Sequence, residues 1–300
     1  MSREQRAHID RQLRQAPPTA NPTPDMLRAN FERFMGSFAV SPEVQVRETT
    51  LGERPALEVA PTGAWRGGTL LYFHGGGYVF GSPRTALSIT AQLVVRTGMR
   101  ARSLDYRLAP EHPFPAAIED ALRAYRDLLD QGTPAAQIAF AGDSAGGGLT
   151  VTTMLAARDA GLPMPGAALA FSPVLDATRG GASMTGKEGS DPIFTREGLA
   201  VTTGHYLAGQ DPQQPLLSPA VCADLSGLAP TLLQAGSNEL LLDDSTRLAT
   251  RAASAGVTVL LDVTGDVPHV FQSYAGVLDE ADLALDRAAA FLRQYVPALP

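Results

Sequence analysis

Gly142-Asp143-Ser144-Ala145-Gly146 is the stretch that decides the fold; it follows an apolar run, Ile138-Ala-Phe-Ala141, and opens a helical pattern. It fits Gly-x-Ser-x-Gly, the sequence of a sharp turn that exposes a serine between a strand and a helix. The flanking glycines leave room beside the backbone of Ser144, and the following helix directs N–H groups and a positive dipole end toward a developing oxyanion. The stretch predicts a nucleophilic serine at residue 144. The structural alternative is a glycine-rich turn that packs a helix closely onto a sheet.

Strand and helix patterns alternate on both sides of this turn. The first two strands follow each other directly, as in an antiparallel pair, whereas helices separate most of the later ones and so require parallel crossovers. Strands are predicted at 44–50, 56–60, 69–73, 101–105, 137–141, 167–171, 231–234 and 257–263, and helices at 84–98, 115–131, 145–159, 242–255 and 279–295. We therefore predict an α/β fold with an eight-stranded, mostly parallel sheet flanked by helices.

Two segments depart from this alternation. Residues 1–40 predict two helices separated by the proline-rich stretch 16–24, and the second helix carries one apolar stripe, expected to be buried, which comprises Leu27, Phe31, Phe34, Met35 and Phe38. Residues 178–219 interrupt the pattern after the sixth predicted strand. We predict an N-terminal helical cap segment at 1–40 and a catalytic core at 41–300, with 178–219 inserted as a second cap segment. Ordinary packing of the stripe on the core is the alternative.

Composition excludes several classes of protein. Hydrophobic residues make up 44% of the 300 residues and charged residues 18%, which is a globular balance. The net charge of −7 does not favour nucleic acid, and the single cysteine, Cys222, permits neither an internal disulfide nor a cysteine zinc site. No apolar run reaches the length of about 18 residues needed to span a bilayer, and the first residues lack a secretory signal. We expect a cytoplasmic protein that needs no cofactor and no metal ion.

A second glycine-rich stretch follows another predicted strand. His74-Gly75-Gly76-Gly77 comes directly after Leu70-Leu-Tyr-Phe73. Glycines leave backbone N–H groups unshielded and let a substrate carbonyl approach closely. The stretch therefore predicts oxyanion donors that complement the N–H of Ala145. We expect His74 to hold this loop in place and not to act as a base.

A nucleophilic serine needs a base and an acid that orients the base. Among the five histidines, His269 follows the last predicted strand and a short loop, which places it at the same edge of the sheet as Ser144. The acid is expected between serine and histidine in the chain. Glu239 is the first carboxylate after the strand at 231–234, and Asp243 and Asp244 remain alternatives for this role.

Four motifs in this order resemble the hormone-sensitive-lipase-like (bacterial family IV) esterases of the α/β-hydrolase superfamily. The motifs are His74-Gly-Gly-Gly77, Asp105-Tyr-Arg-Leu-Ala-Pro-Glu-His-Pro-Phe-Pro115, Gly142-Asp-Ser-Ala-Gly-Gly147 and His269-Val-Phe271. The resemblance covers nearly the whole chain and implies a helical cap and a serine-esterase mechanism without metal. It places the nucleophile on Ser144, the base on His269 and the oxyanion donors on the amides of Gly76, Gly77 and Ala145.

The chain departs from the family at the acid, where Glu239-Leu-Leu replaces the usual aspartate before Pro-Leu. In the second motif, Arg107 and Glu111 are close enough in sequence to pair across a turn, and Asp143 could join them. The substrate pocket is expected to include residues from both cap segments and from the histidine loop: Phe31, Phe34, Phe38, Phe194, Tyr206 and Val270.

We therefore predict a serine carboxylesterase that acts on small esters of short to medium acyl chain through an acyl-enzyme intermediate. Lactone hydrolysis by the same triad is an alternative. A second alternative, from a different class, is a non-catalytic small-molecule receptor on the same fold, as in the plant gibberellin receptors, but these lack the catalytic histidine. The sequence leaves the natural substrate open and allows a homodimer.

Overall fold

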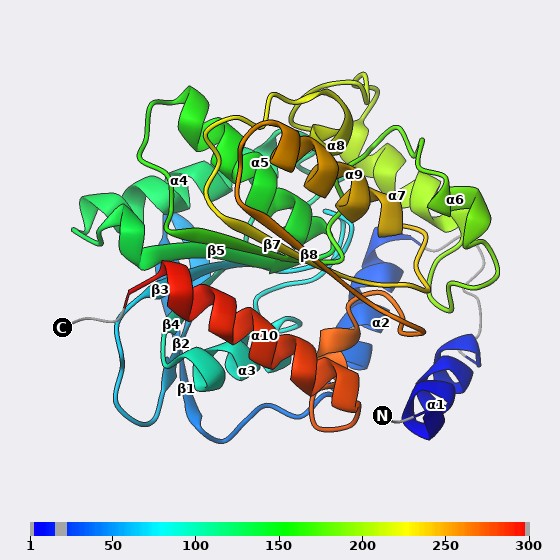
Figure 1. The fold of residues 1–300 in the computed structure, drawn as a ribbon, viewed down its shortest axis with the longest axis horizontal. Coiled ribbons are helices and arrows are strands. Elements are labelled where there is room, and N and C mark those ends of the chain that lie inside the picture. The colour runs from blue at the N-terminus through cyan, green and yellow to red at the C-terminus, as the bar shows by residue number, and fades with distance from the viewer. Residues whose placement is uncertain (1–2, 16–22, 298–300) are drawn as a thin grey trace.

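A computed structural model describes residues 3–15 and 23–297 of the chain, and a single sheet of eight strands forms the centre of these residues (Figure 1). The strand order is β1-β2-β4-β3-β5-β6-β7-β8. The strands are β1 (Val44–Leu51), β2 (Arg54–Pro61), β3 (Thr69–Phe73), β4 (Arg100–Leu104), β5 (Ile138–Asp143), β6 (Ala167–Phe171), β7 (Thr231–Gly236) and β8 (Val259–Thr264). The predicted eight-stranded sheet is confirmed.

The direction of the strands places the site. β2 pairs antiparallel with β1 and with β4, and every later pairing is parallel. The carboxyl ends of β3, β5, β6 and β7 therefore meet at one edge of the sheet. Phe73 lies opposite Gly142, and Asp143 lies opposite Phe171, so the segments that follow these strands begin close together.

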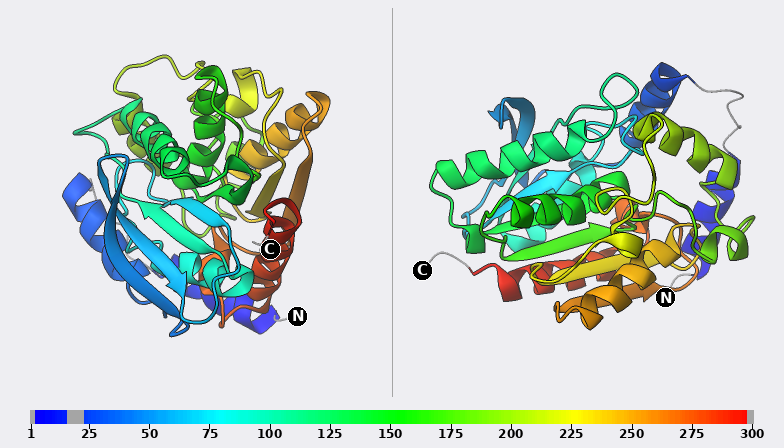
Figure 2. Two further views of the ribbon diagram at one scale, coloured as in Figure 1. Left: turned by 90° about the vertical axis from the view of Figure 1, so that its left-hand side faces the viewer. Right: turned by 90° about the horizontal axis from the view of Figure 1, so that it is seen from above.

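Helices cover both faces of the sheet (Figure 2). α3 (Leu87–Thr97) and α10 (Asp279–Tyr295) share one apolar core with Leu70, Tyr72 and Leu169 of the sheet. α4 (Ala116–Asp130), α5 (Ala145–Asp159) and α9 (Leu242–Ser254) share the other core with Phe73 and Phe140. Both faces of the central strands are thus buried, which explains why β3, β5 and β6 are continuous apolar runs rather than alternating ones.

The inserted segment 178–219 contains helices that the sequence pattern did not reveal. These are α6 (Ser183–Gly186), α7 (Arg196–Leu207) and the start of α8 (Pro219–Cys222). α7 begins after Thr195, whose hydroxyl accepts a hydrogen bond from Gly198 N (3.1 Å). Its interior carries glycine and threonine and little amphipathic pattern, so tertiary contacts of Leu199 and Tyr206 stabilise it more than local propensity does.

The two helices predicted in residues 1–40 are α1 (Arg3–Arg14) and α2 (Pro24–Met35). Most of the proline-rich stretch between them, residues 16–22, lies outside the described residues. α1 buries Ile9 against Val267 and Phe271. No residue of α2 is buried, and Phe34 is 44% exposed. The stripe expected to be buried is buried only in part, because Leu27, Phe31, Met35 and Phe38 are half-buried and Phe34 is exposed. Phe31 packs on Phe80, and Phe34 meets only Phe38 among the aromatic rings of the described residues.

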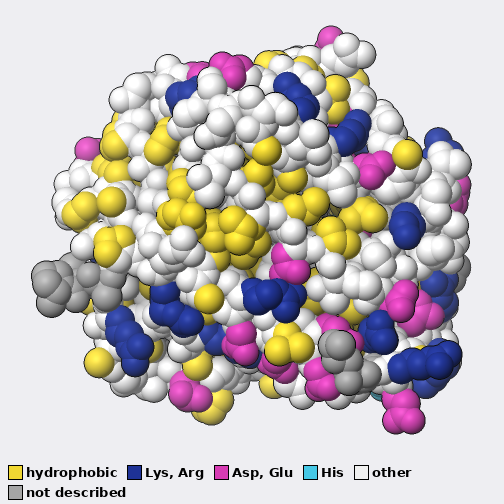
Figure 3. All heavy atoms as spheres, viewed as in Figure 1, with side chains coloured by type: hydrophobic (Ala, Val, Ile, Leu, Met, Phe, Trp, Pro, Cys, Tyr) yellow, Lys and Arg dark blue, Asp and Glu magenta, His cyan; other side chains and the backbone are white. Residues whose placement is uncertain are grey.

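The strand β8 ends the sheet order, so one of its edges has no neighbouring strand within the described residues. Leu260, Leu261 and Val263 on β8 are 46%, 40% and 42% exposed. Figure 3 shows apolar side chains gathered on this face, near the middle of the view. Within residues 3–15 and 23–297, every helix is too short or too polar to cross a bilayer.

Candidate active site

Ser144 sits on a strained turn between β5 and α5. Its backbone has φ 54° and ψ −118°, a positive-φ conformation that a residue with a side chain adopts only when its surroundings hold it there. Ser144 N donates to Phe171 O of the neighbouring β6 (2.8 Å). A Cβ on Gly146 would lie 2.0 Å from Phe73 O, so only glycine allows α5 to approach the end of β3 this closely. The predicted turn is confirmed in its geometry.

A buried carboxylate and a histidine meet beyond the ends of β7 and β8. His269 Nδ1 lies 2.7 Å from Glu239 Oε2, and Glu239 is fully buried. Because a carboxylate accepts the hydrogen bond, the neutral ring carries its proton on Nδ1 and leaves Nε2 as an acceptor. Nε2 is buried and bonds no described residue. The arrangement can accept a proton from a hydroxyl placed beside Nε2.

Ser172 joins this pair, and the sequence did not indicate it. Glu239 Oε1 accepts hydrogen bonds from Ser172 Oγ (3.0 Å) and Gly236 N (2.6 Å). Val270 N in turn donates to Ser172 Oγ (3.0 Å). The only signal in the sequence is the position of Ser172, directly after β6, at the edge where β5 presents Ser144.

The two alternative acids have other partners. Asp243 Oδ2 accepts from Ser183 N (2.9 Å), and Asp244 Oδ2 accepts from the amides of Leu175 (2.7 Å) and Asp176 (2.9 Å). Both lie in the first turn of α9, where carboxylates are favourable. Their contacts hold the segments after β6, whereas the carboxylate of Glu239 contacts the histidine ring.

Asp244 leads to a prediction about stability. Burial raises the pKa of Asp244 to about 7, and the nearby Arg179 charge and the Leu175 amide oppose that rise. From about pH 4 to about pH 7 the folded state holds a proton that the unfolded chain has released, so this group's contribution to the free energy of unfolding falls as pH rises. We expect Asp244→Asn, which abolishes the titration, to become less destabilising over this range. Urea unfolding of both proteins at several pH values measures the effect, and a difference that does not vary with pH contradicts it.

The predicted oxyanion loop lies beside the turn. Gly76 has φ 122°, and a Cβ there would lie 2.0 Å from Phe80 O, so the loop needs glycine at this position. Within the described residues, the amides of Gly76 and Gly77 donate to no acceptor. Ala145 is the first residue of α5, and its N–H is one of the donors that a helix leaves without an internal partner.

Two buried titratable groups hold this loop. His74 Nδ1 lies 2.8 Å from Gly75 O, and the ring stacks on Tyr106 at 4.2 Å. Burial lowers the pKa of His74 to about 4, so the ring is neutral and structural, as predicted. Asp143, under the turn, accepts from Tyr72 Oη (2.8 Å). Burial raises the pKa of Asp143 to about 6, and the Tyr72 hydrogen bond and the His269 charge oppose the rise.

The predicted pairing of Arg107 with Glu111 is wrong. Arg107 instead donates to Asp120 (2.9 Å) and Glu119 (3.0 Å), because α4 presents these carboxylates one turn after it begins. Glu111 accepts two hydrogen bonds from Arg28 of α2 (2.7 and 2.6 Å). The motif at residues 105–115 therefore binds α4 through Arg107 and the N-terminal helix α2 through Glu111.

Several residues predicted to line a pocket lie next to the site. The ring of Phe194 meets the His269 ring edge to face, with centroids 4.7 Å apart. Tyr206 is buried and stacks on Tyr78, the residue after the glycine loop, at 3.9 Å. Val270 follows the histidine with φ 49°. Phe194 and Tyr206 of the inserted segment thus contact the loops that carry His269 and the oxyanion donors, and Val270 belongs to the histidine loop itself.

The predicted pocket residues of α2 and of the turn after it lie farther out. Phe31 packs on Phe80 at 4.9 Å, and Phe80 O is the atom that a Cβ on Gly76 would meet first. Phe38 contacts Tyr274 at 5.2 Å and also meets the exposed Phe34 at 5.4 Å. Among the pocket residues predicted in this segment, Phe31 is the one that contacts the end of the oxyanion loop, where Arg28 of α2 also donates to Val79 O (3.0 Å). A pocket role for Phe34 and Phe38 stays a prediction.

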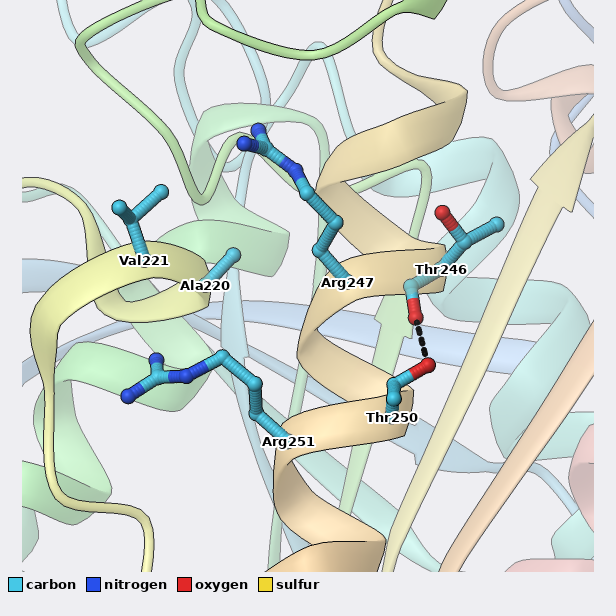
Figure 4. Close-up of a pocket in the computed structure, with 6 residues that line it drawn as sticks. All are labelled: Ala220, Val221, Thr246, Arg247, Thr250 and Arg251. Carbon is cyan, nitrogen blue, oxygen red and sulfur yellow. Dashed lines mark hydrogen bonds between the residues drawn. The ribbon is translucent and has the colours of Figure 1, made fainter.

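A separate pocket of about 400 Å³ lies between α8 and α9 (Figure 4). Its lining comprises Ala220, Val221, Thr246, Arg247, Thr250 and Arg251. Arg251 donates to Pro219 O (2.7 Å) and Ala223 O (2.6 Å), and Arg247 pairs with Asp176 (2.5 Å). Arg251 therefore ties α8 to α9, whereas Arg247 ties α9 to the segment after β6. None of the lining residues contributes to the candidate site.

Metal ligands do not gather among the described residues. Within residues 3–15 and 23–297, no group of three or more histidine, cysteine, aspartate or glutamate side chains is close enough to hold a metal ion.

Comparison with known proteins identifies the family. Residues 70–273 match the family model described as alpha/beta hydrolase fold. The chain is 45% identical to an acetyl-hydrolase of Streptomyces hygroscopicus over 262 residues, which cover 87% of this chain and 86% of the relative. It is 34% identical to an esterase of Acinetobacter venetianus over 280 residues, which cover 92% and 90% of the two chains.

A solved structure agrees with these relatives. An esterase from the bacterial hormone-sensitive lipase family superposes with a TM-score of 0.94 at 40% identity, covering 97% of this chain and 98% of that one. The predicted resemblance is thereby confirmed. The chain belongs to the bacterial hormone-sensitive lipase family of the α/β hydrolases and is an esterase.

Proposed function

We propose that this esterase cleaves small carboxylic esters of short to medium acyl chain through a triad of Ser144, His269 and Glu239. The observation that carries the proposal is the 2.7 Å contact between His269 Nδ1 and the buried Glu239 carboxylate, which leaves Nε2 without a partner in the described structure. A buried imidazole with one nitrogen held by a carboxylate and the other open is the arrangement that a general base requires.

The reaction has two halves. Ser144 Oγ attacks the ester carbonyl while His269 Nε2 takes its proton, and the amides of Gly76, Gly77 and Ala145 stabilise the oxyanion. His269 then protonates the departing alkoxide, which leaves the acyl group on Ser144. A water molecule, deprotonated by His269, then attacks the acyl carbonyl, and the proton returns from His269 to Ser144 Oγ as the carboxylic acid leaves. Glu239 holds the ring orientation and stabilises the imidazolium in both halves.

Contacts around the site support a limited acyl length. The Thr202 side chain of α7 lies 3.4 Å from a Cβ placed on Gly77, so the inserted segment covers the oxyanion loop. The ring of Phe194 packs edge to face on the His269 ring, and Phe31 packs on Phe80 at the end of the oxyanion loop. Walls on several sides bury a small acyl group and exclude water, but they leave little room for a long chain.

Acyl-chain length provides the experimental test. We expect kcat/KM for p-nitrophenyl esters to be greatest at roughly two to eight acyl carbons and to fall at least about tenfold by about twelve carbons. Greatest activity on the longest esters would contradict a closed site. A set of lactones in the same assay decides whether ring opening competes with ester cleavage.

A matched pair of α2 variants tests which residues set this limit. Phe31→Ala should extend the profile toward longer acyl chains, because it removes the ring that packs on Phe80. Met26 lies on the same helix and is 44% exposed, so Met26→Ala should leave the profile unchanged. Equal profiles for the two variants would show that the N-terminal cap segment does not shape the pocket.

A further inference from the structure

Ser172 is held in a fixed conformation at the edge of the sheet. It follows β6, is fully buried and has φ 44°, a strained value for a serine. Its backbone N donates to Gln234 O of β7 (2.6 Å), which prolongs the pairing of the two strands. The direction of its side chain is therefore set by the sheet.

The hydroxyl of Ser172 uses its donor on the acid and accepts from the loop that carries the base. It donates to Glu239 Oε1 (3.0 Å) and accepts from Val270 N (3.0 Å). Val270 follows His269 directly and has φ 49°, so its amide has a defined direction. One hydroxyl thus links the carboxylate oxygen that does not face the ring to the backbone of the histidine loop.

Glutamate needs such a link. Its side chain rotates about three bonds, and the contact with His269 alone fixes only one carboxylate oxygen. Gly236 N and Ser172 Oγ both donate to the other oxygen, which locks the carboxylate plane. Hydrogen bonds to a buried carboxylate are charge-assisted and stronger than neutral ones.

We propose that Ser172 is a positioning residue of the catalytic machinery, which holds Glu239 and the His269 loop in the geometry needed for proton transfer. This inference rests on the proposed function, because it assumes that Glu239 orients His269. Loss of the hydroxyl would release Glu239 Oε1 and leave the Val270 amide without its acceptor.

The test uses two variants that both remove the hydroxyl of Ser172 but differ in their effect on the strained backbone. Ser172→Ala keeps the backbone strain, whereas Ser172→Gly relieves it, since glycine accepts positive φ. We expect kcat to fall by about tenfold or more in both variants, with KM changed by less than about twofold, because misplaced catalytic groups slow the reaction without weakening binding. If both variants keep kcat within about twofold of wild type, the proposal is wrong.

Ser218→Ala provides the matched control. Ser218 is also fully buried, and its hydroxyl also donates to an oxygen, Pro212 O (2.7 Å), and accepts from an amide, Ala177 N (2.9 Å). This variant loses comparable hydrogen bonds away from the triad, so kcat should stay near that of wild type. An equal loss of kcat in Ser218→Ala and Ser172→Ala would mean that the effect is only structural.

A double-mutant cycle separates this inference from the proposed function. If Ser172 acts through Glu239, Ser172→Ala should reduce kcat by less than about twofold in a Glu239→Gln background. If Ser172→Ala still lowers kcat by about tenfold in the Glu239→Gln background, the positioning role is wrong. Failure of the triad itself would instead appear as high activity in a Ser144→Ala variant, which leaves the two outcomes distinct.

Discussion

Ser144→Ala should lose ester hydrolysis almost completely, by about 10⁶ in kcat, while the fold stays intact. The nucleophile supplies the covalent route, and the residual rate comes only from the oxyanion donors and substrate binding. The change deletes one oxygen from a residue that is 8% exposed, so little packing is lost. Steady-state hydrolysis of p-nitrophenyl acetate measures the rate.

Circular dichroism and thermal unfolding provide the control for this variant, because the activity result has meaning only in a folded protein. Retention of more than about a hundredth of the wild-type rate would exclude Ser144 as the nucleophile. Such a result would leave the strained turn after β5 without a catalytic role.

Glu239→Ala should lower kcat by roughly 10³–10⁴, the second-largest effect. The histidine loses the partner that sets its tautomer and stabilises the imidazolium. A substrate panel at saturating concentration measures kcat separately from KM. Ser172 Oγ and Gly236 N also donate to this carboxylate. Part of the loss of kcat will therefore come from these two groups losing their acceptor, in addition to the loss of the hydrogen bond to the His269 ring.

The neighbouring carboxylates are the comparison for this variant. Asp243→Ala and Asp244→Asn remove acids that contact Ser183, Leu175 and Asp176 and not the histidine ring. Each should reduce kcat far less than Glu239→Ala. A greater loss in the Asp243 variant would mean that the acid has been placed on the wrong residue.

The sequence predicts those features of the site that depend on chain order. In a parallel sheet, the segments that follow the strands meet at one edge. The order of strands and helices alone therefore predicts that Ser144, Glu239 and His269 lie at the same edge, although they are far apart in the sequence. The structure places Glu239 and His269 in contact, and it places the Ser144 turn at the end of β5.

Features that depend on tertiary contacts were missed or misjudged. A single serine at the end of a strand forms no recognisable sequence motif, so the role of Ser172 follows only from its hydrogen bonds to Glu239 and Val270. The helix α7 lacks an amphipathic repeat, and packing determines it. Arg107 and Glu111 are four residues apart, yet α4 and α2 provide their partners, because proximity in sequence does not decide pairing when helices approach from two sides.

The most direct test of the account is to locate the covalent adduct. Diethyl p-nitrophenyl phosphate forms a stable ester with a serine that an adjacent histidine activates. After labelling, digestion and mass spectrometry should place one diethylphosphoryl group on Ser144, and Ser144→Ala should take up none. An adduct on another residue, or an unlabelled enzyme that is nevertheless fully inhibited, would contradict the proposed triad.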